Sequence, residues 1–329
     1  MNLEEFDKYI RKNTAREDFY LENSNNTSPL YKKLKKKIVN GKEIIIFEVE
    51  KLKNKEISMM RDSRYTSVPP HCHSNVNINY VYSGKCNYII DNEELTLFQG
   101  DVCIFDKNVI RAKKKLEKND IVFNISMSNS YFSNSLSKRI HEQSIVASFI
   151  INSLSENKNH DNYIIFRTGK NDKIINLFNQ VLLEYHNRNK YSKEIIQSYI
   201  DIAFMELLRL YDINHDKHLV KVNNDVSNVI FEILNYIETS YSDCTIEKLA
   251  KHFKYHPKYL SSLIKNKTGK SFKKLQLIQR MNVASSYLRN TNYSIQEIAE
   301  KVGFSNHTFF YKKFIEIYNM TPREFRAKK

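Results

Sequence analysis

Side chains that can hydrogen-bond to nucleic-acid bases lie in two stretches of the sequence, about fifty residues apart. The first stretch contains Lys258, Ser261, Ser262 and Lys265, and the second contains Asn306, His307, Thr308, Tyr311 and Lys312. Serine, threonine, asparagine and histidine can contact base edges, whereas lysine can contact guanine or hold a phosphate. The alternative for each lysine is phosphate contact or plain solvation, and the alternative for Asn306 and His307 is helix capping.

Two histidines near the middle of the N-terminal half form a second group with chemical potential. His71 and His73 are separated by one residue. If this segment is a strand, both side chains point to the same side and could share a metal or a small ligand. The alternative is that both are polar pocket or packing residues.

The base-contacting residues need helices to position them, and the sequence predicts two helices around the first stretch. Thr245 precedes an apolar run as a helix cap does, and the run places one face of apolar residues toward a core. Pro257 stands where a second helix begins, and Gly269 is typical of its end. The predicted buried faces are Ile246, Leu249, Ala250 and Phe253, followed by Tyr259, Leu260, Leu263 and Ile264. A helix, a tight turn and a second helix predict a helix-turn-helix unit.

The same plan recurs forty-nine residues further along. Ser294 to Ala299 repeats the pattern of Thr245 to Ala250, Gly303 supplies the turn, and a second helix follows with Phe309, Phe310 and Phe314. Between the two units, Phe272 to Arg289 predicts a long amphipathic helix. Arg280 lies on this connecting helix, where we expect a structural or backbone-clamping role rather than base contact.

The rest of the chain divides into regions of different pattern. From Ser67 to about Met127, short runs rich in Ile, Val, Tyr and Phe are broken by turn signals, which is typical of a small barrel or sandwich. From about Ser130 to Tyr211 the spacing of apolar residues is helical and predicts a hairpin. Either the hairpin mediates self-association or all its apolar surface packs within the chain. The predicted divisions are 1–130, 131–213 for the hairpin, 214–225 for a polar linker, and 226–329 for the second helical domain.

The charge is concentrated where the base-contacting residues lie. The chain of 329 residues has a formal net charge of +15, and residues 226–329 contain 18 lysines and arginines against 8 acidic residues, a net of +10. A concentrated basic patch is what phosphate neutralisation requires. The positive charge favours a polyanionic partner, either nucleic acid or an anionic membrane surface, and the alternative is a lysine-rich solvated surface.

Cysteine usage and hydropathy bear on the compartment. The four cysteines, which have no CxxC spacing, are expected to be free thiols of a reducing cytosol. The sequence contains no stretch of 18 apolar residues, so we predict no membrane span. Met1 to Asp7 is acidic and polar, which is not typical of a secretory signal. We therefore expect a cytoplasmic protein, with nucleic acid and not a membrane as the partner of its positive charge.

The stretch from Ile246 to Arg326, about eighty residues, resembles the DNA-binding domain of the AraC/XylS family of transcription regulators. The residues that carry this resemblance are Leu249-Ala250, Tyr259-Leu260, Gly269, Phe272, Arg280, Ala284, Leu288, Ile295, Ile298-Ala299, Val302-Gly303-Phe304-Ser305, Phe309-Phe310, Phe314 and Met320 to Arg326. The sequence departs from the family's pattern at Ile264, Ile315 and Asn319, where the family usually has Phe, Lys and Gly. The loss of lysine at 315 would remove one phosphate contact.

The resemblance implies a way of binding DNA. In a helix-turn-helix unit the second helix enters the major groove and its early exposed residues touch base edges. Two units joined by one rigid helix are expected to place their recognition helices in successive major grooves, roughly 10 base pairs apart. The nine polar residues named first are the predicted DNA contacts.

The segment beginning Pro69-Pro70-His71-Cys72-His73 resembles the cupin-type sensor domain of the same family. Metal-binding cupins usually add a Glu and a later His, but Asn77 and Arg111 stand at the matching positions, which argues against a transition metal. We therefore predict no metal and no cofactor, and we expect His71, His73, Asn77 and Arg111 to line a ligand pocket. Arg111 favours an anionic or polar ligand, unless it is simply an exposed arginine beside Lys113 to Lys115.

These observations predict an α+β multidomain fold: a cupin-like β-barrel with a helical hairpin, then an all-α domain of two helix-turn-helix units joined by a long helix. The predicted function is that of a non-enzymatic, sequence-specific DNA-binding transcription regulator, and we expect a ligand-responsive activator. Its expected partners are double-stranded promoter DNA, RNA polymerase, a small-molecule effector and a second copy of itself. The competing hypotheses are a cupin enzyme with an incidental basic tail and a non-specific architectural DNA binder.

Overall fold

A computed structural model of the chain describes residues 1–23, 28–48, 56–107, 109–128, 131, 163–169, 171–213 and 225–328. The chain divides into two compact units, and of the described residues 1–213 belong to the first unit and 225–328 to the second. The predicted linker 214–225 lies outside the described residues except for Asp225, which begins a helix. Most of the first part of the predicted hairpin, residues 132–162, also lies outside them.

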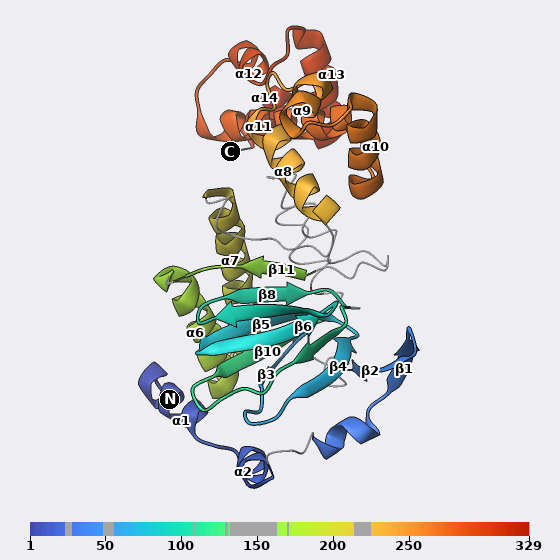
Figure 1. The fold of residues 1–329 in the computed structure, drawn as a ribbon. Coiled ribbons are helices and arrows are strands. Elements are labelled where there is room, and N and C mark those ends of the chain that lie inside the picture. The colour runs from blue at the N-terminus through green and yellow to red at the C-terminus, as the bar shows by residue number, and fades with distance from the viewer. Residues whose placement is uncertain are drawn as a thin grey trace. The chain divides into compact units, whose positions relative to one another are not determined.

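The N-terminal unit is built on two β-sheets (Figure 1). One sheet has the strand order β1-β2-β4-β9-β6-β7 and the other has the order β11-β8-β5-β10-β3. The strands are β1 (Lys36–Val39), β2 (Lys42–Phe47), β3 (Ile57–Arg61), β4 (Val68–His73), β5 (Val76–Ser83), β6 (Lys85–Ile90), β7 (Glu93–Phe98), β8 (Val102–Phe105), β9 (Arg111–Lys113), β10 (Ile121–Met127) and β11 (Tyr163–Phe166).

The predicted cupin-like domain is confirmed, and its strands form two sheets and not a closed barrel. Among the described residues no strand pairs across the two sheets, and each sheet keeps its own edges. Residues 74–75 carry the chain from β4 in one sheet to β5 in the other. Sheets that exchange strands at such corners pack face to face around a shared core.

Strand β5 shows why this region packs on both faces. Alternate side chains of β5 face opposite sides of the sheet. Nearly every residue of β5 is buried, so both faces of the sheet are covered at this strand. Tyr80 stacks on Phe178 of α6 (Asp172–Asn187), with ring centroids 4.5 Å apart. Val81 instead belongs to the core cluster that includes Phe105, Val122 and Leu97. The apolar alternation thus places a helical layer on one face and the sandwich core on the other.

The helical hairpin is confirmed in its described part, but one segment that we expected to be helical is a strand. Helices α6 and α7 (Ser192–Ile213) pack against each other and against the β8–β5–β10 sheet (Figure 1). Tyr163–Phe166, which we expected to be helical, forms strand β11 and pairs with β8. All four of its residues are buried. A short apolar run can be a buried strand or part of a buried helix, and periodicity cannot separate the two.

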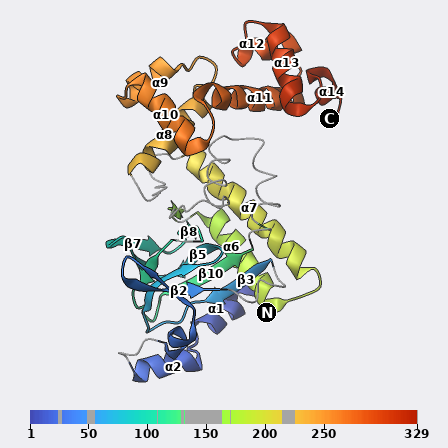
Figure 2. The same cartoon turned by 90° about the vertical axis from the view of Figure 1, so that its right-hand side faces the viewer.

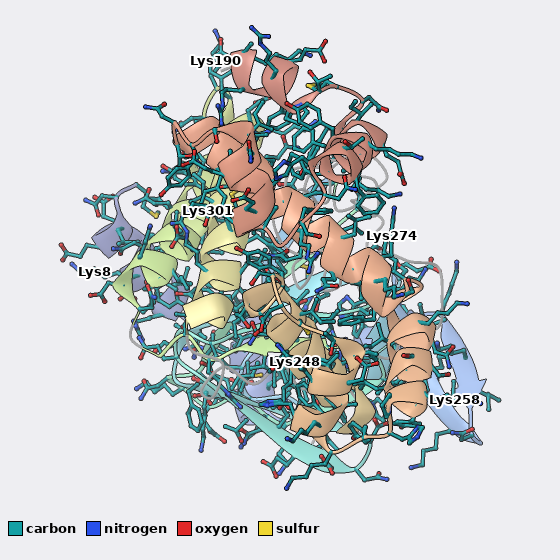
Figure 3. All side chains as sticks on the ribbon, turned by 90° about the horizontal axis from the view of Figure 1, so that it is seen from above. Lys8, Lys190, Lys248, Lys258, Lys274 and Lys301 are labelled. Atoms are coloured by element: carbon teal, nitrogen blue, oxygen red, sulfur yellow. The ribbon has the colours of Figure 1, made fainter. Side chains whose placement is uncertain are left out.

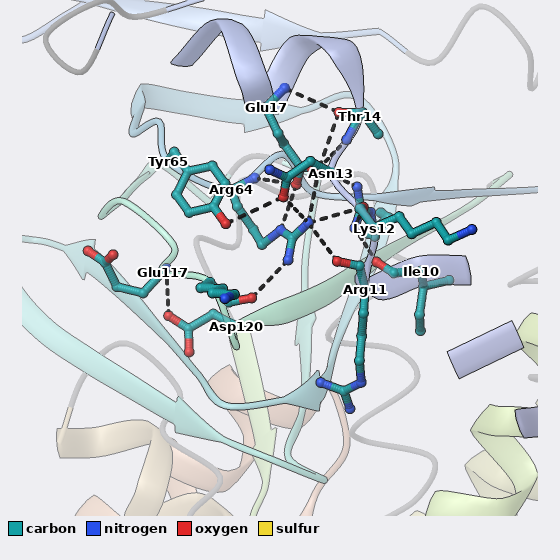
Figure 4. Close-up of polar contacts among 12 residues, drawn as sticks. Ile10, Arg11, Lys12, Asn13, Thr14, Glu17, Arg64, Tyr65, Glu117 and Asp120 are labelled. Carbon is teal, nitrogen blue, oxygen red and sulfur yellow. Dashed lines mark hydrogen bonds and ion pairs between the residues drawn. The ribbon is translucent and has the colours of Figure 1, made fainter. Parts of the chain in front are cut away.

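A buried carboxylate is among the groups that attach the N-terminal segment to the sheets. The segment forms α1 (Leu3–Arg11), α2 (Ala15–Glu22) and the 3-10 helix η1 (Pro29–Lys33). Glu17 is fully buried; its Oε1 accepts hydrogen bonds from the Nε and the backbone N–H of Arg64, each at 2.9 Å (Figure 4). Its Oε2 accepts from Arg61 at 2.6 Å. Burial alone would raise the pKa of Glu17, but the hydrogen bonds from Arg64 and Thr14 and the charge of Arg61 lower it to about 2.

The C-terminal unit is entirely helical in its described residues. Its helices are α8 (Asp225–Thr239), α9 (Ile246–Phe253), α10 (Pro257–Thr268), α11 (Phe272–Asn290), α12 (Ile295–Lys301), α13 (His307–Tyr318) and α14 (Pro322–Ala327). Figure 2 shows α11 running from the α9–α10 pair to the α12–α13 pair. Met281, Ala284 and Leu288 of α11 are buried against Phe310 and Phe314 of α13. The connecting helix is thus part of the core of the second unit.

Two predictions about composition can be compared with the described residues. All four cysteines are buried and free, as expected. Across the part of the chain that the structure describes, no helix has the length and apolar character needed to cross a membrane.

Candidate functional site

The first candidate site is the helix pair α9–α10. Thr245 caps α9 through its side chain, which accepts a hydrogen bond from the backbone of Lys248 at 3.2 Å. The turn closes through a hydrogen bond from Tyr255 N to Ala250 O, at 2.9 Å. His256 caps α10, Pro257 is its first residue, and Gly269 ends it in the left-handed region with φ 69°. The predicted helix boundaries of this unit are confirmed.

The pair α12–α13 repeats this geometry. Ser294 and Glu297 form a capping box at α12, and Phe304 N donates to Ala299 O at 2.9 Å, which matches the turn of the first unit. Asn306 caps α13, and Asn319 ends it in the left-handed region with φ 54°. The family's usual glycine is thus replaced by the residue that tolerates this conformation best after glycine. Helices α10 and α13, the second helices of the two helix-turn-helix units and hence the recognition helices, have the same length and correspond residue by residue at an offset of fifty.

Arg280 joins the two units, as we expected of a structural clamp. Its guanidinium donates to three carbonyl oxygens: Tyr241 O at 2.9 Å, Ser242 O at 2.8 Å and Gly303 O at 2.9 Å. The first two carbonyls lie just before the first unit and the third lies in the turn of the second unit. Gly303 has φ +86°, and a Cβ built there would lie 2.5 Å from Ser242 O. The clamp therefore requires a glycine at this turn.

On α10 the predicted contact residues form an exposed surface. Lys258, Ser261, Ser262 and Lys265 are all exposed, and neither lysine forms an ion pair with a described residue. One prediction about this helix is wrong: Tyr259, which we expected on the buried face, is 50% exposed. Its ring lies 5.3 Å from the ring of Tyr255. The buried face is narrower than periodicity suggested, because Leu260, Leu263 and Ile264 already fill the contact with the rest of the unit.

On α13 the predicted residues divide between exposed and capping positions. Thr308, Tyr311 and Lys312 are exposed. Asn306 uses its Oδ1 to cap the helix, accepting from Phe309 N at 2.9 Å. His307 is the first residue of the helix, and its Nε2 lies 3.4 Å from Glu300 Oε1. The capping alternative thus describes Asn306 in the free protein, and its side-chain amide remains on the same end of the helix as the exposed residues.

Lysines of several helices surround these exposed surfaces. Figure 3 labels Lys258 on α10, Lys248 on α9, Lys274 on α11 and Lys301 on α12, all on the C-terminal unit. Lys248 is paired with Asp243 at 2.6 Å. Lys313 of α13 is likewise paired, with Glu316 Oε2 at 2.6 Å, whereas Lys258, Lys265 and Lys312 form no ion pair with a described residue. Their charge is therefore available to phosphates.

The second candidate site is the interior of the sandwich, where the structure brings the four predicted ligand-binding residues close together. His71 and Arg111 are direct partners across the β4–β9 ladder. Arg111 Nη2 donates to Asn77 Oδ1 at 2.7 Å, and the rings of His71 and His73 lie 5.6 Å apart. All four side chains are buried, so the alternative of an exposed Arg111 is wrong.

Sequence reasoning missed a further set of interior polar residues that extend this cluster. Asn79 donates to Asn77 Oδ1 at 2.6 Å, and the Tyr88 hydroxyl donates to Asn79 Oδ1 at 2.6 Å. Asn77 also donates to Asn124 and, at 3.2 Å, to Ser126. The available signal was the occurrence of polar residues at alternate positions of two apolar strands, where asparagine is disfavoured.

The electrostatics of this interior cluster are unusual. No described carboxylate pairs with Arg111; instead its guanidinium lies 3.9 Å over the Phe105 ring, and its Nε has no hydrogen-bond partner in the described part of the chain. Burial lowers the pKa of Arg111, although an arginine stays protonated. Burial and the neighbouring charge of Arg111 also lower the pKa of His71 and His73 well below the usual histidine value. The cluster therefore carries a buried positive charge beside neutral imidazoles.

A metal site does not emerge from these groups. No three His, Cys, Asp or Glu side chains gather as a metal site within the ranges that the structure describes. His73 Nδ1 has no hydrogen-bond partner among the same residues. The arrangement can instead accept a hydrogen-bonding ligand with a negative charge, because a buried cation without an anion is electrostatically unsatisfied.

Comparison with known proteins matches both units to family models. Residues 61–190 match the AraC-like ligand binding domain, and residues 249–328 match a helix-turn-helix domain. The chain is 36% identical over 94 residues to the regulatory protein PocR of Salmonella typhimurium, covering 28% of this chain and 31% of that protein. It is 22% identical over 275 residues to the melibiose operon regulatory protein of Escherichia coli, covering 78% and 82% of the two chains.

Among solved structures, the C-terminal domain of the two-component response regulator yesN from Fusobacterium nucleatum is 36% identical, with a TM-score of 0.29, covering 30% of this chain and 98% of that one. The matched region spans only 15% to 31% of the length of three of the curated relatives.

Proposed function

Because this chain belongs to the AraC family of transcription regulators, we propose that it binds promoter DNA in the cytoplasm through both helix-turn-helix units and activates transcription in response to an effector. The observation that carries the proposal is the repeated geometry of α9–α10 and α12–α13, fixed to each other through Arg280. The family consists of DNA-binding regulators, so the alternative of a cupin enzyme is set aside.

The exposed residues of the recognition helices are the proposed DNA contacts. In α10 these are Lys258, Ser261, Ser262 and Lys265, and in α13 and its cap they are Asn306, His307, Thr308, Tyr311 and Lys312. Because α11 joins the two helix-turn-helix units within the C-terminal unit, α10 and α13 would enter successive major grooves roughly 10 base pairs apart. Activation would follow from contact with RNA polymerase at the promoter.

A salt titration tests the DNA-binding proposal. Lys258→Ala or Lys312→Ala should weaken binding to the target site, because each removes one phosphate contact. Each should also make the negative slope of log K against log salt concentration shallower by about 1. Lys190→Ala, in the loop between α6 and α7, is the matched control and should leave the slope unchanged. If both recognition-helix variants keep the wild-type affinity and slope, our placement of the DNA surface is wrong.

We propose that the effector is a small anion held in the sandwich by Arg111, with Asn77, His71 and His73 around it. Among the described residues the buried Arg111 guanidinium has no carboxylate partner, and Arg111 Nε and His73 Nδ1 have no hydrogen-bond partner, which supports this ligand class. A thermal-shift screen with acetate, benzoate and inorganic phosphate should find an anion that raises the unfolding temperature of the wild type and not of Arg111→Met. A neutral ligand that acts equally on both would contradict the proposed role of Arg111.

We further propose that a second copy of the chain packs on the exposed face of α7. Ile195, Ile202 and Met205 lie along this face and are 37–44% exposed. Their spacing of seven and three residues is that of a helix–helix contact. Sedimentation equilibrium should detect a dimer that Ile202→Glu disrupts, whereas Gln180→Glu on the exposed part of α6 should not. A monomeric wild-type protein at micromolar concentration would refute the proposal.

A further inference from the structure

The two recognition helices expose an aromatic ring at the same position. Tyr259 is the third residue of α10 and Phe309 is the third residue of α13, and the rings are 50% and 48% exposed. The next residue of each helix, Leu260 or Phe310, is fully buried. A single exposed apolar residue is ordinary on a protein surface. Two at matched positions of two repeated helices indicate a shared role.

Each ring is supported on one side and open on the other. The Tyr259 ring lies against Tyr255, with centroids 5.3 Å apart. The Phe309 ring lies 6.1 Å from the Phe304 ring, and Lys313 Nζ lies 5.6 Å from its centroid. This support reduces the side-chain entropy lost when the open face is covered, so each ring is suited to bind rather than to move aside.

The surroundings of the rings decide what covers them. Lys258 and Thr308 precede the two rings, Ser261 and Tyr311 follow two residues later, and all of these side chains are exposed. An apolar protein partner would have to bury the lysines and hydroxyl groups along with the rings, at a considerable desolvation cost. DNA has phosphates for the lysines and base edges for the hydroxyl groups, so its chemistry fits the whole surface.

One group in the major groove matches an exposed ring. The early residues of a recognition helix face the base edges, and the C5-methyl of thymine is the apolar group presented there. We infer that Tyr259 and Phe309 each pack against a thymine methyl, so that each of the two blocks of the target site contains a thymine that the ring selects. The inference rests on the proposed function and adds specificity residues that were absent from the polar set.

The test replaces thymine by uracil, which removes only the C5-methyl. The full-length protein is titrated with its target duplex, obtained by selection, and with duplexes carrying deoxyuridine at one thymine at a time. Removing a contacted methyl should weaken binding roughly four-fold, the value of one buried methyl-sized group. One sensitive position is expected in each block, and substitution outside the blocks should have no effect.

Variants then assign each methyl to its ring. Phe309→Ala should abolish the effect of uracil in the block bound by the second unit and leave the effect in the other block intact. Tyr259→Ala should do the converse. Tyr259→Phe keeps the ring and removes only the hydroxyl, so it should retain the full methyl effect. Circular dichroism of each variant checks that the helices are intact.

The outcomes separate the two claims. Selection of no preferred duplex would overturn the proposed function and this inference with it. A preferred duplex whose affinity is unaffected by uracil at every thymine would overturn the inference alone. The inference is also overturned if uracil weakens binding but Phe309→Ala and Tyr259→Ala leave both methyl effects unchanged, because other side chains would then contact the methyl groups.

Discussion

Replacing Gly303 by alanine should open the second helix-turn-helix unit selectively. The backbone at Gly303 has φ +86°, and the new Cβ would lie 2.5 Å from Ser242 O and 3.1 Å from two guanidinium atoms of Arg280. The carbonyl belongs to the backbone and cannot move aside cheaply. Arg280 must therefore shift, although it already donates to three carbonyl oxygens.

The magnitude follows from three contributions. The left-handed conformation costs an alanine about 1 kcal/mol. Overpacking against a fixed carbonyl costs about 1–3 kcal/mol, and part of a charge-assisted hydrogen bond is lost when Arg280 moves. We therefore expect Gly303→Ala to destabilise the unit by about 3–4 kcal/mol.

Gly269→Ala is the matched control. Gly269 ends α10 with φ +69°, but a Cβ built there would meet no atom within 4 Å. It should cost only the conformational part, about 1 kcal/mol. Lys254, at the turn of the first unit that corresponds to Gly303, already has a side chain at φ 57°. This comparison indicates that conformation alone does not require glycine at 303.

Hydrogen exchange of the full-length protein provides the assay, because it reports each helix separately. For each variant, the acceleration of amide exchange is measured relative to wild type. The acceleration in α12 and α13 of Gly303→Ala should exceed that in α9 and α10 of Gly269→Ala roughly 30- to 150-fold, which corresponds to a difference of about 2–3 kcal/mol in opening free energy. Equal acceleration in the two variants would show that the close approach to Ser242 contributes nothing, and the argument about the Arg280 clamp would fail.

Two further predictions concern single polar groups. Glu17→Gln should destabilise the N-terminal unit by about 3 kcal/mol at pH 7, because it leaves Arg61 and Arg64 without a counter-charge; the matched exposed variant Glu4→Gln should change little. The pKa of Glu17 is about 2 in the folded protein and 4.5 ordinarily, so its contribution to the free energy of unfolding is complete above pH 4.5 and is lost as the pH falls toward 2. Urea titrations should therefore show the difference in unfolding free energy between wild type and Glu17→Gln closing over that interval. A difference independent of pH would contradict the assignment. Asn306→Ser should keep the helix cap and relax the sequence preference in competition binding assays, whereas Asn306→Ala should also lose about 1 kcal/mol of stability; an unchanged preference in the serine variant would limit Asn306 to capping.

The helix-turn-helix units could be predicted from sequence because their signals are local. Caps, a first-turn proline and a terminal glycine or asparagine lie within a few residues of the helices they bound, as at Thr245, Pro257 and Gly269. The exposed state of Tyr259 could not be predicted, because the width of the buried face depends on how α10 packs against other helices.

The N-terminal unit was predicted less completely because its important contacts are long-range. Glu17 and Arg64 are 47 residues apart, and Asn77 and Asn124 also 47 apart, so no local pattern links them. Tyr163–Phe166 depends on β8 for its strand conformation. The spacing of His71 and His73 and the resemblance that added Asn77 and Arg111 pointed to the interior cluster, but neither indicated Asn79, Tyr88 or Asn124.

Selection of bound fragments from genomic DNA tests the central claim most directly. The purified full-length protein is incubated with the fragments and competitor DNA at near-physiological salt, and the recovered fragments are sequenced. Our account predicts a shared motif of two blocks about one helical turn apart, roughly 10 base pairs between centres. Recovery of fragments with no shared motif, or with only one block, would contradict the claim that both units bind specific DNA together.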